Sequence, residues 1–238
     1  MTSLRIILFN LLFFVLLSQC SSSPQISNKQ EDEVSYSSPI KYLALGDSYT
    51  IGESVKEQLR WPVQLVDSLK ENGVETSELK IIARTGWTTS ELQSGIISDS
   101  PNSPYDLVSL LIGVNNQYRG YDIEIYRTEF RELLELAIEF TGNDSTKVFV
   151  VSIPNYGVTP FGQTKGEDKI RQELLEYDAI ASHIALEYGI PFVNITPISE
   201  KAKQVTSLIA SDELHPSGKM YSEWVHEILP TVLSLLEQ

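Results

Sequence analysis

The chain has 238 residues, of which 42% are hydrophobic, enough for one domain with a sizeable core. Its formal net charge is −14 and it has no basic cluster, so charge alone would attract neither nucleic acid nor an anionic membrane surface. The single cysteine excludes an internal disulfide.

The N-terminus has the composition of an export signal. Residues 6–17 form an apolar run, broken only by Asn10, that is shorter than the roughly 20 residues of a membrane span. Cys20 follows, and the arrangement resembles the lipobox of bacterial lipoproteins, although Gln19 stands where a small residue is usual. We expect residues 1–20 to be an export signal and a lipidated Cys20 to tether the protein to a bacterial envelope membrane. The alternative is an ordinary secretory signal with a periplasmic or secreted product.

The folded unit is expected at residues 40–238, after a polar, Ser-rich linker at residues 21–39. Short apolar runs predict strands at residues 42–45, 79–83, 107–112, 148–153 and 191–195. Amphipathic stretches between and after them predict helices at residues 61–70, 88–97 (capped by Thr88 or Thr89), 124–140, 169–188 and 224–236.

These elements predict a doubly wound, three-layer α/β/α sandwich. Strands that are apolar on both faces and separated by helices indicate a five-stranded parallel sheet covered on both sides. Sites in such sheets form at the carboxyl ends of the strands. Ser48, Gly86 and Asn115 each follow one of the first three strands, so we expect them at one edge.

A candidate nucleophile and its base lie far apart in the sequence. Ser48 ends the run Gly-Asp-Ser, and a hydrolytic serine needs a base oriented by a carboxylate. His183 and His226 lie in helical stretches, whereas His215 lies three residues after Asp212 in the turn-like segment DELHP. This spacing places the carboxylate against one ring nitrogen and leaves the other for Ser48. The alternatives are a plain turn at Ser48 and a helix-capping loop at His215.

Three groups are candidate donors to a developing oxyanion. Gly86 has no Cβ, so its N–H can approach a ligand closely, and Asn115 offers a neutral amide. The backbone N–H of Ser48 is the third. Each residue alone is equally typical of a turn.

This ordered set resembles the SGNH (GDSL-type) hydrolase superfamily, from residue 40 to the C-terminus. The resemblance implies flavodoxin-like strand order 2-1-3-4-5 and ester or thioester hydrolysis without a cofactor. It implies Ser48 as nucleophile, Asp212 and His215 as acid and base, and Ser48, Gly86 and Asn115 as the oxyanion hole. No metal site is expected from three histidines, one cysteine and no H-E-x-x-H motif.

One position departs from the family pattern. The third block usually reads G-x-N-D, and here the block reads GVNN, with Asn116 in place of the family's Asp. Asn is nearly isosteric and keeps one acceptor oxygen. An alignment that makes Asn116 the donor would break the Gly-x-Asn spacing.

The substrate is expected to be a small acyl ester. Tyr118, Asn155 and Tyr156 follow strands three and four and are candidate substrate-binding residues, or else loop anchors. Arg119 is a candidate for an anionic substrate group or for a salt bridge. A carboxylesterase or acylhydrolase is predicted, with a carbohydrate acetylesterase, lysophospholipase or thioesterase as alternatives. A non-catalytic binding module and a flavodoxin-like cofactor binder are rivals from other classes. No residue pattern specifies an oligomeric state.

Overall fold

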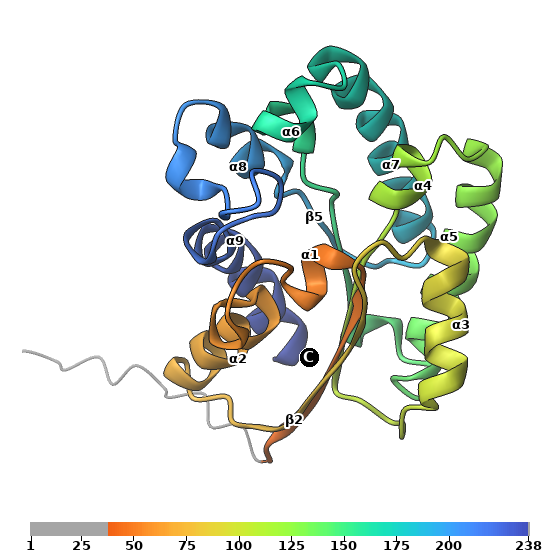
Figure 1. The fold of residues 1–238 in the computed structure, drawn as a ribbon. Helices are drawn as coiled ribbons and strands as arrows, with labels where there is room; N and C mark the ends of the chain where they lie inside the picture. Colours follow the sequence, from red (N-terminus) through yellow and green to blue (C-terminus); the bar gives the residue numbers. More distant parts are fainter. Residues whose placement is uncertain (1–37, 238) are drawn as a thin grey trace, which may run out of the picture. The chain divides into compact units, whose positions relative to one another are not determined.

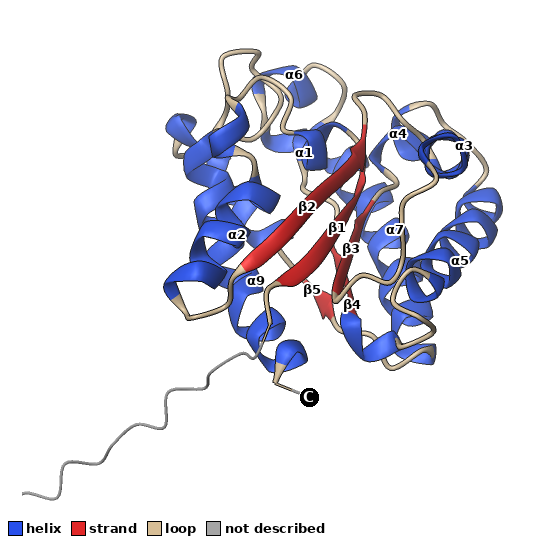
Figure 2. Ribbon diagram, turned by 90° about the horizontal axis from the view of Figure 1, so that it is seen from below, coloured by secondary structure: helices blue, strands red, loops and turns tan. Residues whose placement is uncertain are grey.

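The computed structural model describes residues 38–237, so Cys20 and the predicted export signal lie outside the described residues. One parallel sheet runs through the domain in the order β2-β1-β3-β4-β5 (Figures 1 and 2). Its strands are β1 (Ile40–Gly46), β2 (Thr76–Ala83), β3 (Leu107–Leu111), β4 (Val148–Val151) and β5 (Phe192–Val193). The predicted fold class and strand order are therefore confirmed.

The sheet is buried as its sequence suggests. Every residue of β3 and β4 is buried, because apolar residues point to both faces and helices cover both. The edge strand β2 is only partly buried, in keeping with the polar residues of its first half.

Two helical layers cover the sheet. Helices α2 (Trp61–Glu71) and α9 (Gly218–Leu236) pack together on one face (Figure 2). The other face carries α3 (Thr89–Asp99), α5 (Ile123–Glu139) and α7 (Glu167–Glu187). Helix α9 begins six residues before the predicted start at 224, because Ser217 caps it by accepting the Met220 N–H at 3.3 Å.

Short helices were not predicted, and they line the carboxyl edge of the sheet. They are α1 (Ser48–Ile51), α4 (Val114–Tyr118), α6 (Pro160–Gln163) and α8 (Thr196–Glu200), which follow β1, β3, β4 and β5. Single 3₁₀ turns lie at Glu57–Leu59, Ser145–Lys147, Tyr156–Val158, Lys201–Lys203 and Thr206–Leu208. None of these segments is long enough for a 3.6-residue periodicity to show in the sequence.

The strand register aligns the carboxyl ends of β1, β2 and β3 at one edge of the sheet. Gly46, the last residue of β1, pairs with Ala83 of β2 and with Leu111 of β3. The residues that follow these three strands therefore emerge side by side at the same edge. Across residues 38–237, no helix combines the length and apolar character that crossing a membrane requires.

Candidate active site

Ser48 opens helix α1 directly after β1. A Cβ on Gly46 would lie 2.6 Å from the Leu111 carbonyl oxygen, so only glycine allows this close exit from the sheet. Asp47 caps α1, with its Oδ1 accepting the Tyr49 N–H at 3.0 Å. The cap and the missing Cβ together hold Ser48 at the rim of a cavity, where its side chain is largely buried.

Asp47 itself does not line this cavity. It is fully buried, and its Oδ2 has no hydrogen-bond partner among the described residues. Burial raises the pKa of Asp47 to about 7, despite the N–H groups that stabilise its charged form. This carboxyl is therefore a structural cap that is protonated in mildly acidic solution.

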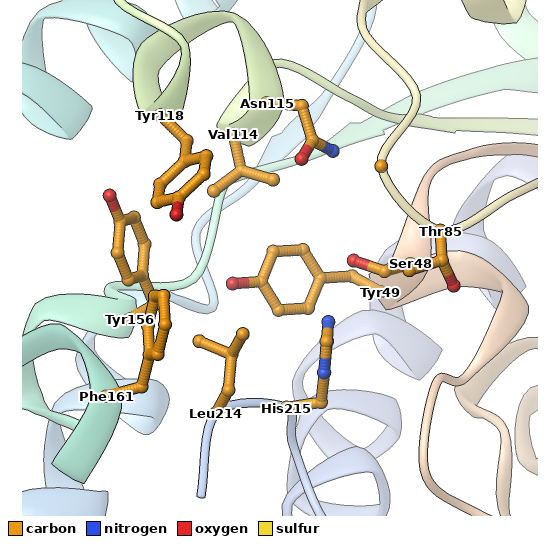
Figure 3. A pocket seen from close by; sticks show the side chains of 11 residues that line it. Ser48, Tyr49, Thr85, Val114, Asn115, Tyr118, Tyr156, Phe161, Leu214 and His215 are labelled. Atoms are coloured by element: carbon orange, nitrogen blue, oxygen red, sulfur yellow. The ribbon is translucent and has the colours of Figure 1, made fainter. Parts of the chain in front are cut away.

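Asp212 and His215 form a compact turn. Asp212 Oδ1 accepts the N–H groups of Leu214 at 3.0 Å and His215 at 2.9 Å. Its Oδ2 lies 2.6 Å from His215 Nδ1, which fixes the ring and leaves the other nitrogen free. Figure 3 shows that free nitrogen pointing toward Ser48. No hydrogen bond joins the two side chains among residues 38–237 of the structure, as is common in sites without substrate.

The base of this turn is closed by backbone bonds. Ile209 and Pro216 form an antiparallel bridge, and the Ala210 N–H donates to the His215 carbonyl at 2.8 Å. Glu213 adopts φ +64° within the turn, a left-handed conformation that reverses the chain between the carboxylate and the imidazole.

Ser54 is a functional candidate that the sequence did not reveal. Its hydroxyl donates to Asp212 Oδ2 at 2.6 Å, from a loop 158 positions away in the chain. Partial burial alone would raise the pKa of Asp212, but hydrogen bonds from Ser54, His215 and Leu214 lower it to about 2. Asp212 is therefore ionised across the neutral range, as an acid that stabilises an imidazolium must be.

The three predicted oxyanion donors come from three segments around the same cavity. The N–H groups of Ser48 and Gly86 have no acceptor among the described residues. Asn115 Nδ2 donates one hydrogen to the Trp87 carbonyl at 2.9 Å, which orients the amide and leaves its second hydrogen available. Gly86 has φ +88°, which favours glycine at this position.

Arg119 supports the Gly86 peptide from behind. Its Nη2 donates to the Gly86 carbonyl at 2.6 Å, and its Nη1 pairs with Glu91 at 3.2 Å. Of the two expectations for Arg119, the structure therefore shows the salt bridge, and it adds a hydrogen bond to the main chain at Gly86.

The departure from the family pattern at Asn116 has a structural counterpart. Asn116 is fully buried; its Oδ1 accepts the Thr89 N–H at 3.1 Å and its Nδ2 donates to Thr89 Oγ1 at 2.7 Å. The Thr89 hydroxyl then donates to Glu129 on α5. Asn116 thus anchors the start of α3 to the segment that carries Asn115. The carboxylate nearest to it along this chain of hydrogen bonds is that of Glu129, which Thr89 links to Asn116.

A mainly apolar cavity of about 190 Å³ opens beside Ser48 and His215. It is lined by Ser48, Tyr49, Thr85, Gly86, Val114, Asn115, Tyr118, Tyr156, Phe161, Leu214 and His215 (Figure 3). The Tyr118 ring lies 6.4 Å from that of Tyr156 and 6.2 Å from that of Phe161, so three aromatic rings form one end wall.

Asn155, the third candidate for substrate binding, is not among the residues that line this cavity. Its Oδ1 accepts the Gly157 N–H at 2.9 Å, and its Nδ2 donates to Glu200 at 3.2 Å. Asn155 therefore caps a buried 3₁₀ turn. The adjacent Tyr156 faces the cavity as expected.

Neither His183 nor His226 lines the cavity at Ser48. His183 pairs with Glu187 on the exposed side of α7, with 3.2 Å between Nε2 and Oε1. Among the residues that the structure describes, no three His, Cys, Asp or Glu side chains gather as metal ligands would.

The fold, a parallel sheet in flavodoxin-like order 2-1-3-4-5 flanked by helices, is an α/β fold like that of GDSL hydrolases. The model of the GDSL-like Lipase/Acylhydrolase family matches residues 44–222, and the chain belongs to this family. Membership indicates an ester hydrolase. No functionally curated protein matches the chain in sequence.

Solved structures share the fold at low sequence identity. A family 3 carbohydrate esterase of Clostridium thermocellum superposes with TM-score 0.63 at 19% identity, covering 84% of this chain and 98% of its own. An acetyl xylan esterase of Geobacillus stearothermophilus gives 0.60 at 19%, covering 84% and 96%. A lipase/acylhydrolase of Enterococcus faecalis gives 0.59 at 21%, covering 82% and 96%.

Proposed function

We propose that this protein hydrolyses short-chain acyl esters through Ser48, His215 and Asp212. The observation that carries the proposal is the His215 ring, fixed by Asp212 at 2.6 Å, with its free nitrogen turned toward Ser48 in a cavity that Gly86 and Asn115 also line. A nucleophile, a base, an orienting acid and oxyanion donors are the complete set that acyl transfer needs.

In the first half-reaction, His215 removes the Ser48 proton as the hydroxyl attacks the ester carbonyl. The tetrahedral oxyanion accepts hydrogen bonds from the Ser48 and Gly86 N–H groups and from the Asn115 amide. Asp212 stabilises the imidazolium. His215 then gives its proton to the departing alcohol, and Ser48 is left acylated.

In the second half-reaction, His215 removes a proton from water, which attacks the acyl-enzyme. The same three donors hold the second oxyanion. Collapse releases the carboxylic acid and returns the proton from His215 to Ser48.

The size of the cavity supports a short acyl group. An apolar protein cavity of roughly 150 Å³ holds benzene, so about 190 Å³ accommodates an acyl chain of up to about six carbons. We expect kcat/KM to fall for chains longer than this. A lysophospholipase or a long-chain thioesterase would need the chain to extend past the aromatic wall.

A carbohydrate acetylesterase is the second candidate. Two structural neighbours are named as esterases of carbohydrate or acetyl xylan, and an acetyl group needs little of the cavity. The three rings of Tyr118, Tyr156 and Phe161 supply the aromatic surface on which sugars stack. A panel of acyl esters and acetylated sugars separates the two candidates.

The decisive test of the mechanism is Ser48→Ala. We expect turnover of 4-nitrophenyl acetate to fall by about 10³-fold or more, with an unchanged unfolding midpoint. The wild type should also be labelled by a fluorophosphonate, and the variant should not. Undiminished turnover in the variant would refute the assignment of Ser48 as nucleophile. A wild type that is neither labelled nor active would point instead to a non-catalytic binding module on this fold.

The envelope location stays a proposal from the sequence. We propose that Cys20 is lipidated after export and tethers the domain to a membrane, on the basis of the apolar run before it. Mass spectrometry of the mature N-terminus tests this, and an unmodified residue there would exclude the tether.

A further inference from the structure

A second cavity lies directly behind the aromatic wall of the first. It has a volume of about 370 Å³ and shares Tyr118 and Tyr156 with the cavity at Ser48. Tyr118 is 52% exposed, although it packs against two other rings. Tyr118 and Tyr156 therefore border both cavities.

The second cavity is unusually basic for this chain. Three of its lining residues are Arg119, Lys165 and Lys169, whereas the whole protein carries 32 acidic against 18 basic side chains. Glu173 is its one acidic lining residue. The local charge is thus opposite in sign to the net charge of −14.

The three cations differ in how far they are neutralised. Arg119 is paired with Glu91 at 3.2 Å, and Lys169 lies 3.7 Å from Glu173, whose other oxygen accepts from Gln117 at 2.7 Å. Lys165 forms no ion pair with any described residue, and its Nζ lies 5.6 Å from the centre of the Phe161 ring. Because Phe161 lines the cavity at Ser48, the ammonium group stands one ring away from it.

We propose that Lys165, assisted by Lys169 and Arg119, binds a carboxylate or phosphate group carried by the ester substrate. This inference rests on the proposed function and names the substrate class of the same site. The ester carbonyl lies at Ser48, and the anionic end passes over the exposed ring of Tyr118, at the rim of the aromatic wall, to the basic cavity. Lys165 is exposed and has no carboxylate partner among the described residues, so an anionic group can form a charge-assisted hydrogen bond with it directly.

The test compares related esters with and without an anionic group. One pair is 4-nitrophenyl hydrogen adipate and 4-nitrophenyl methyl adipate, and the other is acetylglycerol phosphate and monoacetylglycerol. The readout is the ratio of kcat/KM for the anionic ester to that for its neutral partner, measured in wild type, Lys165→Gln and Lys147→Gln. Lys147 lies just before β4, at the opposite edge of the sheet, and controls for net charge.

We expect the ratio to exceed one in wild type and to fall about three- to tenfold in Lys165→Gln, with no fall in Lys147→Gln. High salt should lower the ratio in wild type and have less effect in Lys165→Gln, because the contact is partly exposed. A fall confined to one pair identifies the anion as a carboxylate or as a phosphate.

An equal ratio in wild type and Lys165→Gln would overturn the inference while leaving ester hydrolysis standing. If the wild type hydrolyses no member of either pair, the proposed function fails. In that case, the anion-binding inference is tested by calorimetry, which measures the binding of monomethyl adipate and of dimethyl adipate to wild type and to Lys165→Gln. Tighter binding of the anion that disappears in the variant supports the site, and equal binding refutes it.

Discussion

The hydroxyl of Ser54 and the imidazole of His215 share one oxygen of Asp212, each at 2.6 Å. Ser54 follows the nucleophile by six residues, in the loop after α1, while Asp212 and His215 belong to the turn before α9. This hydrogen bond ties the segment that carries Ser48 to the segment that carries its base. Ser54 is thus a positioning residue in the proposed mechanism.

Removing the Ser54 hydroxyl should weaken catalysis without abolishing it. We expect kcat for Ser54→Ala to fall about three- to tenfold, because one hydrogen bond to a charged group is lost at a site that water can reach. The pKa of Asp212 should rise from its value of about 2, which ¹³C NMR of its carboxyl group measures directly.

Ser54→Gly is the matched control. Ser54 has φ +65°, a conformation that glycine adopts freely, so this variant removes the hydroxyl and relieves the backbone. Both variants should lose activity alike, while only the glycine variant gains stability. Full activity in Ser54→Gly would show that the loop conformation matters and the hydroxyl does not.

Truncating the Asn115 amide should act on the chemical step. We expect Asn115→Ala to lower kcat by about 10²–10³, the usual cost of one oxyanion donor, with KM little changed. Asn102→Ala is the control, because Asn102 lies in an exposed loop and its main-chain carbonyl, which the substitution keeps, accepts the Lys41 ammonium group. A large rise in KM with unchanged kcat would assign Asn115 to ground-state binding.

The hydrogen bonds of Asn116 predict that a carboxylate is tolerated either at position 129 or at position 116, but not at both. In Asn116→Asp, two carboxylates compete for the single Thr89 hydroxyl proton, so we expect a loss of stability of about 1–3 kcal/mol and lower kcat. In the double variant Asn116→Asp with Glu129→Gln, the Thr89 hydroxyl donates to the new carboxylate at position 116 and accepts from the new amide at position 129.

A double-mutant cycle by urea unfolding measures this coupling. The double variant should be more stable than the sum of the two single changes, and its kcat should recover in parallel. Additive losses would show that Asn116 and Glu129 act independently, contrary to the chain of hydrogen bonds.

Asp178 on α7 should make stability fall as the pH rises. Its carboxyl accepts the Ile153 N–H at 2.9 Å and the Thr196 hydroxyl at 3.2 Å, and burial raises its pKa to about 7. Between about pH 4 and 7 the folded state keeps a proton that the unfolded state releases. The stabilisation is therefore complete below about pH 4 and is lost as the pH passes 7.

Asp178→Asn keeps an acceptor for Ile153 and cannot ionise, so its stability should depend less on pH. At about pH 8 we expect the variant to exceed wild type by on the order of 3 kcal/mol or less, and at about pH 4 the two should be similar. Urea unfolding at both pH values tests this. Parallel pH profiles would show that Asp178 does not carry the dependence.

The sequence predicted those parts of the candidate site that depend on the identity of a residue and on its position directly after a strand. Ser48, Gly86 and Asn115 follow three strands whose apolar character is plain, and the parallel register brings them to one edge. Asp212 and His215 are three residues apart, so their contact is local and readable from spacing.

The sequence was silent where a contact joins distant loops. The hydrogen bond between Ser54 and Asp212 spans 158 positions, and nothing in the residues near Ser54 marks it. The basic cavity likewise combines Arg119 after α4 with Lys165 before α7, and neither residue stands in a cluster along the chain. The orientation of Asn155 could not be predicted, because a position after a strand indicates which edge of the sheet a residue reaches and not which way its side chain turns.

The aromatic wall has a consequence for how this enzyme can diversify. Tyr118 lies on α4 and Phe161 lies on α6. In the proposed mechanism, the Asn115 amide is the one group of these two helices that takes part in the chemical steps. Exchanging these rings for smaller side chains would join the two cavities while leaving the Asp212–His215 turn and its backbone bridge intact. The residues that select the substrate are therefore separate from those that carry out the reaction. Libraries of variants restricted to the wall residues are a direct route to an altered substrate range.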